Sequence, residues 1–285
     1  MELLYQGTAA AEGIPSFFCT CEVCALARAK GGREIRQRSS ALLDGVLKLD
    51  FGPDSYRQML DIGENYANLR SVLITHSHDD HFSVGDLSCR RRGFADLPDG
   101  TPPLTVYGNE RVGEMLRPFL GDRLAFTPLS PFEPVQIEGY TVTALEAVHC
   151  VNYTVQTYPI EYEGKTLYRS ENAFFYLIEK DGSSLLYAHD TDEFTQNDLE
   201  YLKGRHIRLI SLDCTSGIRV TQWIGHMCIP DCLNMREKLL ACGAADENTI
   251  FVANHFSHNG YTTFEDIQSR LPGFVIAQDG LRLEF

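Results

Sequence analysis

The sequence predicts a mixed α+β fold in which sheets are covered by helices on their outer faces. Short apolar segments typical of strands occur in both halves of the chain, and segments with helix-capping signals lie between them. Several of these strands run directly into residues that can bind a metal, as in "SVLITHSHDDH" at 71–81. Functional side chains commonly lie on loops held at strand ends, so this recurrence also predicts where a site lies.

The predicted strands share an apolar run that ends in a polar group. The hairpin within 173–188 is indicated by its two-residue turn, Asp181-Gly182. The strands and the residues that follow them are 71–75 before His76, 140–148 before His149, 173–188 before Asp190, 207–212 before Asp213, and 249–254 before His255.

The predicted helices have capping residues at their ends. Asparagine and proline favour the start of a helix, glycine favours its end, and a Thr-x-x-Glu capping box marks a start. On these grounds we expect helices at 110–120 after the cap Asn109, from Pro230 to Gly243, and at 262–271, where Thr262 and Glu265 form the capping box.

Composition narrows the class of protein. The net charge of −14 argues against a nucleic-acid binder, which needs a basic surface. The first residues show no basic segment followed by an apolar run, and no apolar stretch reaches the length that spans a membrane. We therefore expect a cytoplasmic protein. Its nine cysteines then indicate reduced thiols and a metal cluster rather than a disulfide framework.

The strongest chemical signal is the pattern H-x-H-x-D-H, formed by His76, His78, Asp80 and His81. Two histidines that are two residues apart on an extended segment point the same way and can share one metal ion. Asp80 and His81, displaced around a turn, can reach a second ion beside the first. Imidazoles packed this closely would repel one another without a cation, so the cluster predicts a metal site.

The remaining strand ends supply the ligands that this cluster lacks. We predict a dinuclear site with His76, His78 and His149 on one ion, Asp80, His81 and His255 on the other, and Asp190 as the bridge. Nitrogen and oxygen ligands suit zinc, manganese or iron, and the sequence does not choose among them.

Two ions about 4 Å apart can hold a hydroxide between them as a nucleophile and clamp a phosphoryl or carbonyl oxygen. Asp80 is therefore expected to serve catalysis as well as metal binding. His226, in "IGHM", is the candidate general acid for the leaving group. A second metal signal is the loop with Cys19, Cys21 and Cys24, but a closed tetrahedral site needs a fourth ligand that spacing alone does not identify.

The histidine and aspartate motifs, taken in their order along the chain, resemble those of the metallo-β-lactamase fold superfamily. The resemblance covers essentially the whole chain. The resemblance implies a four-layer αββα sandwich, a single hydrolase domain at 1–285, and a site at one edge between two sheets. It also implies that Asp50, in "LKLDFGPD", orients the histidine loop without binding metal.

A narrower likeness, to the PhnP-type cyclic phosphodiesterases, is carried by "GTAAAEGIPSFFCTCEVC", "RQRSSALL" and "NHFSH". In that family a structural zinc is bound by the cysteine loop and by a histidine three residues after the last catalytic one, here His258. The likeness therefore implies a structural zinc on Cys19, Cys21, Cys24 and His258, in addition to two divalent ions at the active site. The likeness also implies that the substrate is a small phosphodiester, which could be cyclic. A homodimer is a possible assembly.

Other functions share these motifs. The same metals could hydrolyse a lactone or a carboxylic ester. A tRNA-processing nuclease would carry a Gly/Pro-rich arm, which is missing here. A non-catalytic binding protein similar to PqqB shares the cysteine loop, but it predicts degraded catalytic ligands, whereas the ligands of this chain are intact. The segments 88–103 and 152–172 are long for the smallest PhnP-type members, and we expect both to border the pocket. We expect Arg90, Arg91 and Arg92 to lie on a solvated face, and the alternative is that they face a phosphate.

Overall fold

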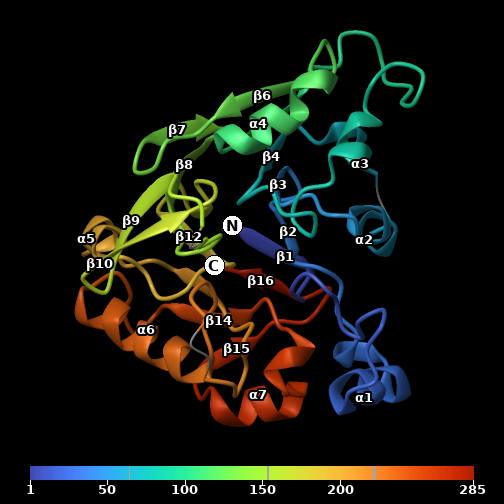
Figure 1. Cartoon of the computed structure of the whole chain (residues 1–285). Helices are drawn as coiled ribbons and strands as arrows, with labels where there is room; N and C mark the ends of the chain where they lie inside the picture. The colour runs from blue at the N-terminus through green and yellow to red at the C-terminus, as the bar shows by residue number, and fades with distance from the viewer. Residues whose placement is uncertain (64, 153, 221–222) are drawn as a thin grey trace.

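The computed structural model describes residues 1–63, 65–152, 154–220 and 223–285. Most strands belong to two seven-stranded sheets that face each other (Figure 1). In spatial order, the first sheet contains β16 (Arg282–Glu284), β1 (Glu2–Gly7), β2 (Ser40–Leu43), β3 (Leu47–Leu49), β4 (Ser71–Leu73), β5 (Leu104–Gly108) and β6 (Leu124–Pro128). The second contains β15 (Phe274–Ile276), β14 (Ile250–Asn254), β13 (Leu209–Asp213), β12 (Ser183–Ala188), β11 (Phe174–Lys180), β8 (Tyr140–Glu146) and β7 (Pro134–Ile137).

Strand residues of the first sheet alternate between two apolar layers. Leu73 lies in the central hydrophobic cluster that both sheets share, whereas its neighbours Val72 and Ile74 lie in a smaller outer cluster. Leu3 and Leu4 of β1 divide in the same way. Because successive side chains of a strand point to opposite faces, each strand packs on the second sheet with one face and on helices with the other.

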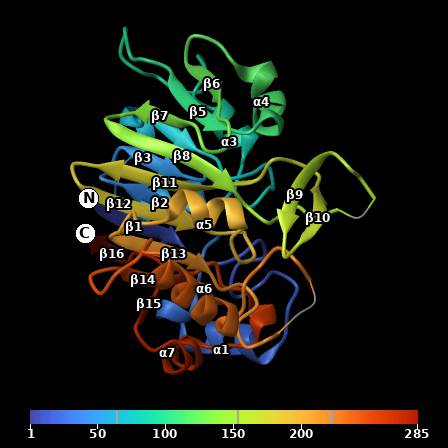
Figure 2. The same ribbon diagram turned by 90° about the vertical axis from the view of Figure 1, so that its left-hand side faces the viewer.

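Helices cover the outer face of each sheet (Figures 1 and 2). The helices beside the first sheet are α2 (Ser55–Asp61), α3 (Val84–Ser88) and α4 (Glu110–Leu116), and those beside the second are α5 (Gln196–Leu202), α6 (Ile229–Ala241) and α7 (Phe264–Arg270). α1 (Glu22–Lys30) begins directly after Cys21 and contains Cys24, and single 3₁₀ turns lie at η1 (Gly32–Glu34), η2 (Tyr66–Asn68), η3 (Arg117–Phe119) and η4 (His258–Gly260). The predicted four-layer αββα sandwich is confirmed.

The predicted local signals are mostly found in place. Asn109 caps α4 by accepting from the Val112 N–H, and Asp181-Gly182 turns between β11 and β12 with both residues at positive φ. The capping box of α7 was predicted one residue too early. It joins Thr263 to Asp266, because both pairs have the required spacing and only packing selects the register.

Two long segments were expected beside the pocket. Part of the second, 152–172, forms the hairpin β9 (Tyr158–Tyr162) and β10 (Lys165–Arg169), which projects from the sandwich (Figure 2); Tyr153 lies outside the described residues. The prediction is wrong for 88–103, which lines a different cavity, beside Phe51 and Leu104.

The expectation that Arg90, Arg91 and Arg92 lie on a solvated face is also wrong for one of them. Arg90 is buried, and its guanidinium donates to the carbonyls of Tyr66, Ala67 and Pro102.

Among the described residues, none of the helices has the length and apolar character needed to span a membrane.

The topology gathers the strand ends that carry the candidate ligands. β12, β13 and β14 run parallel in the second sheet, as do β3, β4 and β5 in the first, so their carboxyl ends share one edge of each sheet. Asp50, Asp190 and His255 each follow such a strand with φ between 51° and 62°. Non-glycine residues adopt this left-handed region rarely, and it clusters at functional sites.

Candidate metal centre

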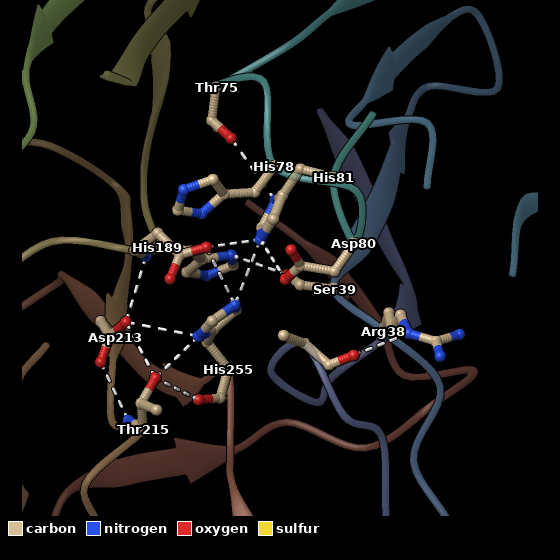
Figure 3. A network of polar contacts seen from close by, with 12 residues as sticks. Arg38, Ser39, Thr75, His78, Asp80, His81, His189, Asp213, Thr215 and His255 are labelled. Atoms are coloured by element: carbon tan, nitrogen blue, oxygen red, sulfur yellow. Dashed lines mark hydrogen bonds and ion pairs between the residues drawn. The ribbon is translucent and has the colours of Figure 1, made fainter. Parts of the chain in front are cut away.

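The seven predicted active-site ligands come together at this edge, in two clusters. Figure 3 labels four of them, His78, Asp80, His81 and His255. One cluster consists of His76, His78 and His149, and it also includes Cys150, which the sequence did not single out. The other consists of Asp80, His81, Asp190 and His255. Within each cluster the candidate ligand atoms lie within 4.8 Å of one another. Segments up to 179 residues apart in the sequence therefore meet at one site.

Asp190 lies between the two clusters. Its Oδ2 contacts His81 Nε2 and lies 3.2 Å from His255 Nε2 and 3.8 Å from His76 Nε2. Its Oδ1 lies 3.9 Å from His149 Nε2. The carboxylate thus lies between the two groups of imidazoles, with Oδ2 near both groups and Oδ1 toward His149, which is the position predicted for a bridging ligand.

The first cluster has the donor chemistry of a metal site. His76 Nε2 is buried without a hydrogen-bond partner among the described residues, although its ring is held at Nδ1, 3.0 Å from Thr75 Oγ1. His149 Nδ1 contacts the Gly225 carbonyl at 3.1 Å, which leaves its Nε2 for the cluster. Burial, together with neighbouring imidazoles, lowers the pKa of His76 well below its usual value and that of His149 to about 4. Neutral imidazole is the form that binds metals, so this cluster fits a divalent cation.

The second cluster is dominated by carboxylates. Burial lowers the pKa of His81, but the charges of Asp80, Asp190 and Asp50 outweigh burial and raise it well above its usual value. The pKa of His255 is likewise raised, to about 10, by Asp190 and Asp213 against the effect of burial. Raised histidine pKa values show that the electrostatic potential of this cluster is negative. A divalent cation bound there would neutralise the excess negative charge.

Asp50 occupies the orienting position that the resemblance implied. Its Oδ2 lies 2.7 Å from His81 Nδ1, so the ring presents Nε2 to the cluster. Its Oδ1 accepts from the Thr75 N–H at 2.8 Å and from the Thr75 hydroxyl at 3.0 Å. Asp50 therefore fixes both the backbone before His76 and the ring of His81, as outer carboxylates of metal sites commonly do.

Two further carboxylates support the ligands and were not assigned from the sequence. Asp213, fully buried, accepts from the Asp190 N–H and from His226 Nδ1 at 3.1 Å each. Glu171 accepts from both the backbone N–H and the hydroxyl of Ser77, between the first two ligand histidines. The strand-end pattern pointed to Asp213, whereas Glu171 lies in a polar stretch that carries no signal of its own.

His226 lies at the rim of the site. Its Nδ1 is 3.1 Å from Asp213 Oδ2 and 3.4 Å from Asp190 Oδ1, and about a third (32%) of its side chain is exposed. It lines a cavity of about 340 Å³, a volume in the range of small-molecule sites. The residues that line this cavity are Ala10, Ala11, Glu12, His78, Asp80, His149, Asp190, Thr215, Ser216, Arg219, Trp223, His226, His255, Ser257 and Asn259.

The cysteine loop meets the histidine that the PhnP-type likeness indicated. Ligand atoms of Cys19, Cys21, Cys24 and His258 lie within 4.8 Å of one another. His258 Nδ1 is 3.4 Å from Cys19 Sγ, while its Nε2 is 3.4 Å from Glu12 Oε1. Burial raises the pKa of Cys21, but nearby donors, the Cys24 N–H foremost, lower it to about 7 overall. Three sulfurs and one imidazole are a donor set typical of structural zinc.

Two facing sheets, helices on their outer faces and a His/Asp cluster at one edge define a metallo-β-lactamase-type fold with a metal site. A family model described as the β-lactamase superfamily domain matches residues 48–256. The chain belongs to the β-lactamase superfamily.

Known relatives extend this likeness to the whole chain. Coenzyme PQQ synthesis protein B of Methylorubrum extorquens (strain PA1) is 26% identical over 312 aligned positions, which cover all of both chains. The crystal structure of a new diphosphatase from the PhnP family matches with a TM-score of 0.74 at 21% identity, over 100% of this chain and 97% of the other. Zinc-bound PqqB from Methylobacterium extorquens matches with a TM-score of 0.74 at 20% identity, over both whole chains. Both structural matches support the fold.

Proposed function

We propose that the protein is a metal-dependent hydrolase that acts on small phosphodiesters. The observation that carries the proposal is the position of Asp190, whose carboxylate lies between two ligand clusters beside a cavity that His226 also lines. When bound, two divalent ions supply Lewis acidity to the substrate and lower the pKa of water. We propose zinc or manganese for these ions, and zinc for the cysteine site.

The residues of the chain hold and orient these groups. His76, His78 and His149 would hold one ion, and Asp80, His81 and His255 the other, with Asp190 shared. Both clusters adjoin the same cavity, because His78, Asp80 and His255 are among its lining residues. A phosphodiester group seated there would therefore lie against both ligand sets.

Protonation of the leaving oxygen is assigned to His226. Asp213 holds the ring at Nδ1, so Nε2 is the nitrogen left to act on a substrate in the cavity. The partial exposure of the ring allows it to exchange its proton with solvent between turnovers. A positioned acid of this kind contributes about 10²–10⁴-fold to a rate.

The solved structure of a diphosphatase from the PhnP family adds support, since that protein has the same fold. The test is turnover of bis-p-nitrophenyl phosphate, 2′,3′-cyclic nucleotides and a panel of lactones by the purified, metal-loaded protein. We expect hydrolysis of the phosphodiesters, and its loss in Asp190→Ala. Turnover of lactones alone would assign the site to carboxylic esters instead.

A second candidate function is a role in coenzyme PQQ synthesis. The full-length similarity to PQQ synthesis protein B at 26% identity favours it. One complementation experiment distinguishes the two functions. Rescue of PQQ production in a strain that lacks its own PqqB, by wild type and by Asp190→Ala alike, would support this role without hydrolysis. Rescue by neither, with phosphodiester turnover in vitro, would support the first function.

A further inference from the structure

The catalytic cavity extends beyond the metal ligands. The loop after β13 contributes Thr215, Ser216, Arg219 and Trp223 to its lining. Asp80 and His226 line the same cavity, so a substrate held at the metal centre would extend toward this loop. The chemistry of the loop therefore bears on which substituent the phosphodiester carries.

Arg219 has no counter-ion among the residues that the structure describes. Among the described residues that line the cavity, it is the only lysine or arginine. No ion pair or side-chain hydrogen bond involves its guanidinium within the described part of the chain, although Glu12, Asp80 and Asp190 line the same cavity. A guanidinium left exposed there can bind phosphate oxygens in a bidentate manner.

Trp223 adds an aromatic surface at the same place. It is the single tryptophan of the chain, and 81% of its surface is exposed. It also lines a neighbouring cavity, together with Tyr162 of the β9–β10 hairpin and with His226. A large exposed aromatic beside a ligand cavity is suited to stack on a nucleobase, which is a sequence-tolerant interaction.

We propose that Arg219 and Trp223 select nucleotide substrates: the base stacks on Trp223, and a phosphate beyond the scissile one binds Arg219. This inference rests on the proposed phosphodiesterase function and narrows its substrate class to nucleotide esters with at least two phosphates. The other wall is compatible with a ribose, because the Glu12 carboxylate and Ser257 line the cavity beside the metal ligands.

Binding to the metal-loaded enzyme can be followed directly, since Trp223 is the sole source of tryptophan fluorescence. The probes are adenosine, AMP and the non-hydrolysable α,β-methylene analogue of ADP. We expect the analogue to quench Trp223 with a dissociation constant at least about tenfold below that of AMP, equivalent to about 1.4 kcal/mol. Arg219→Ala should abolish this difference, whereas Arg270→Ala, a control on the exposed end of α7, should keep it. Equal binding of AMP and the analogue by the wild type would overturn the assignment of Arg219.

Kinetics supply the second readout. Arg219→Ala and Trp223→Ala should each lower kcat/KM for ADP-ribose at least about tenfold more than for bis-p-nitrophenyl phosphate, and Trp223→Phe should recover most of the loss. Equal losses on both substrates would refute the selection. If the wild type binds the analogue in an Arg219-dependent manner but hydrolyses neither substrate, the nucleotide subsite stands and the proposed phosphodiesterase function fails.

Discussion

Replacement of the buried Lys48 by methionine gives the most quantitative prediction about stability. Lys48 lies in β3 with no exposed surface, and its Nζ donates to Gln6 Oε1 at 2.8 Å and to the Ser40 hydroxyl. No carboxylate lies within ion-pair distance of it in the described part of the chain. Burial lowers the pKa of Lys48 from 10.5 to about 7, although the charge of Asp50 opposes this shift.

The direction of the effect follows from proton linkage. Between pH 7 and 10.5 the unfolded chain binds a proton at Lys48 that the folded chain has lost, so the free energy of unfolding rises with pH. The slope of this contribution is at most about 1.4 kcal/mol per pH unit. Over the whole window it amounts to about 4 kcal/mol. Lys48→Met removes the titrating group and therefore this contribution to the pH dependence.

Urea unfolding at pH 7, 8 and 9, at fixed metal concentration, measures the difference between Lys48→Met and wild type. The variant should be stabilised relative to wild type most at pH 7, and this advantage should shrink by about 1 kcal/mol per pH unit. Gln6 loses a donor in the variant, at a cost of about 1–3 kcal/mol that does not depend on pH, so the slope is the decisive quantity. Lys165→Met, at an exposed position of β10, is the control. Parallel pH profiles of variant and wild type would refute the reasoning.

Three carboxylate replacements test the supports of the metal sites. Glu171→Gln should weaken metal binding at the His/Asp centre about 10–100-fold, as measured by competition with a chelator. Asp213→Asn should lower the free energy of unfolding by about 2–4 kcal/mol, because buried donors lose a charged acceptor, and should reduce turnover about 100-fold or more through His226. Glu12→Gln should weaken zinc at the cysteine site about 10–100-fold through His258 and leave metal at the other centre unchanged, as measured by zinc release to a chelator.

One variant controls for all three replacements. Glu200→Gln removes a carboxylate from the exposed face of α5 and should change none of the three quantities. Metal affinity unaltered in Glu171→Gln, stability unaltered in Asp213→Asn, or equal metal loss from both centres in Glu12→Gln would each contradict the corresponding support role.

The clustering of the candidate ligands could be predicted because it depends on residue type and strand ends. His76 and His78 follow one apolar run, and His149, Asp190 and His255 each follow another, so a sheet that aligns these ends brings the side chains together. No exact distance is needed for that inference. The cysteine loop identified three sulfurs in the same way, but its fourth ligand came from the family resemblance.

The supporting contacts could not be predicted because they depend on packing. Glu171 reaches Ser77 across 94 residues of sequence, and neither residue lies in a pattern that links them. Cys150 enters the first cluster only because the chain turns at positive φ directly after His149. The sequence around Arg90 indicates a surface residue, whereas in the structure its guanidinium donates to three backbone carbonyls. Such contacts are decided by where backbone groups lie in space, and sequence spacing does not encode this.

The carboxylates that support the site act on the backbone as well as on side chains. Asp50 accepts from the Thr75 N–H and Glu171 from the Ser77 N–H, which brackets His76 on both sides.

Asp213 does the same at the second sheet by accepting from the Asp190 N–H. A hydrogen bond to a backbone N–H fixes the path of the loop, whereas a hydrogen bond to a side chain fixes only one rotamer. These carboxylates therefore hold the loops that carry the candidate ligands. We therefore expect metal binding to order few further residues of these loops, and loss of one of these carboxylates to weaken metal affinity about 10–100-fold.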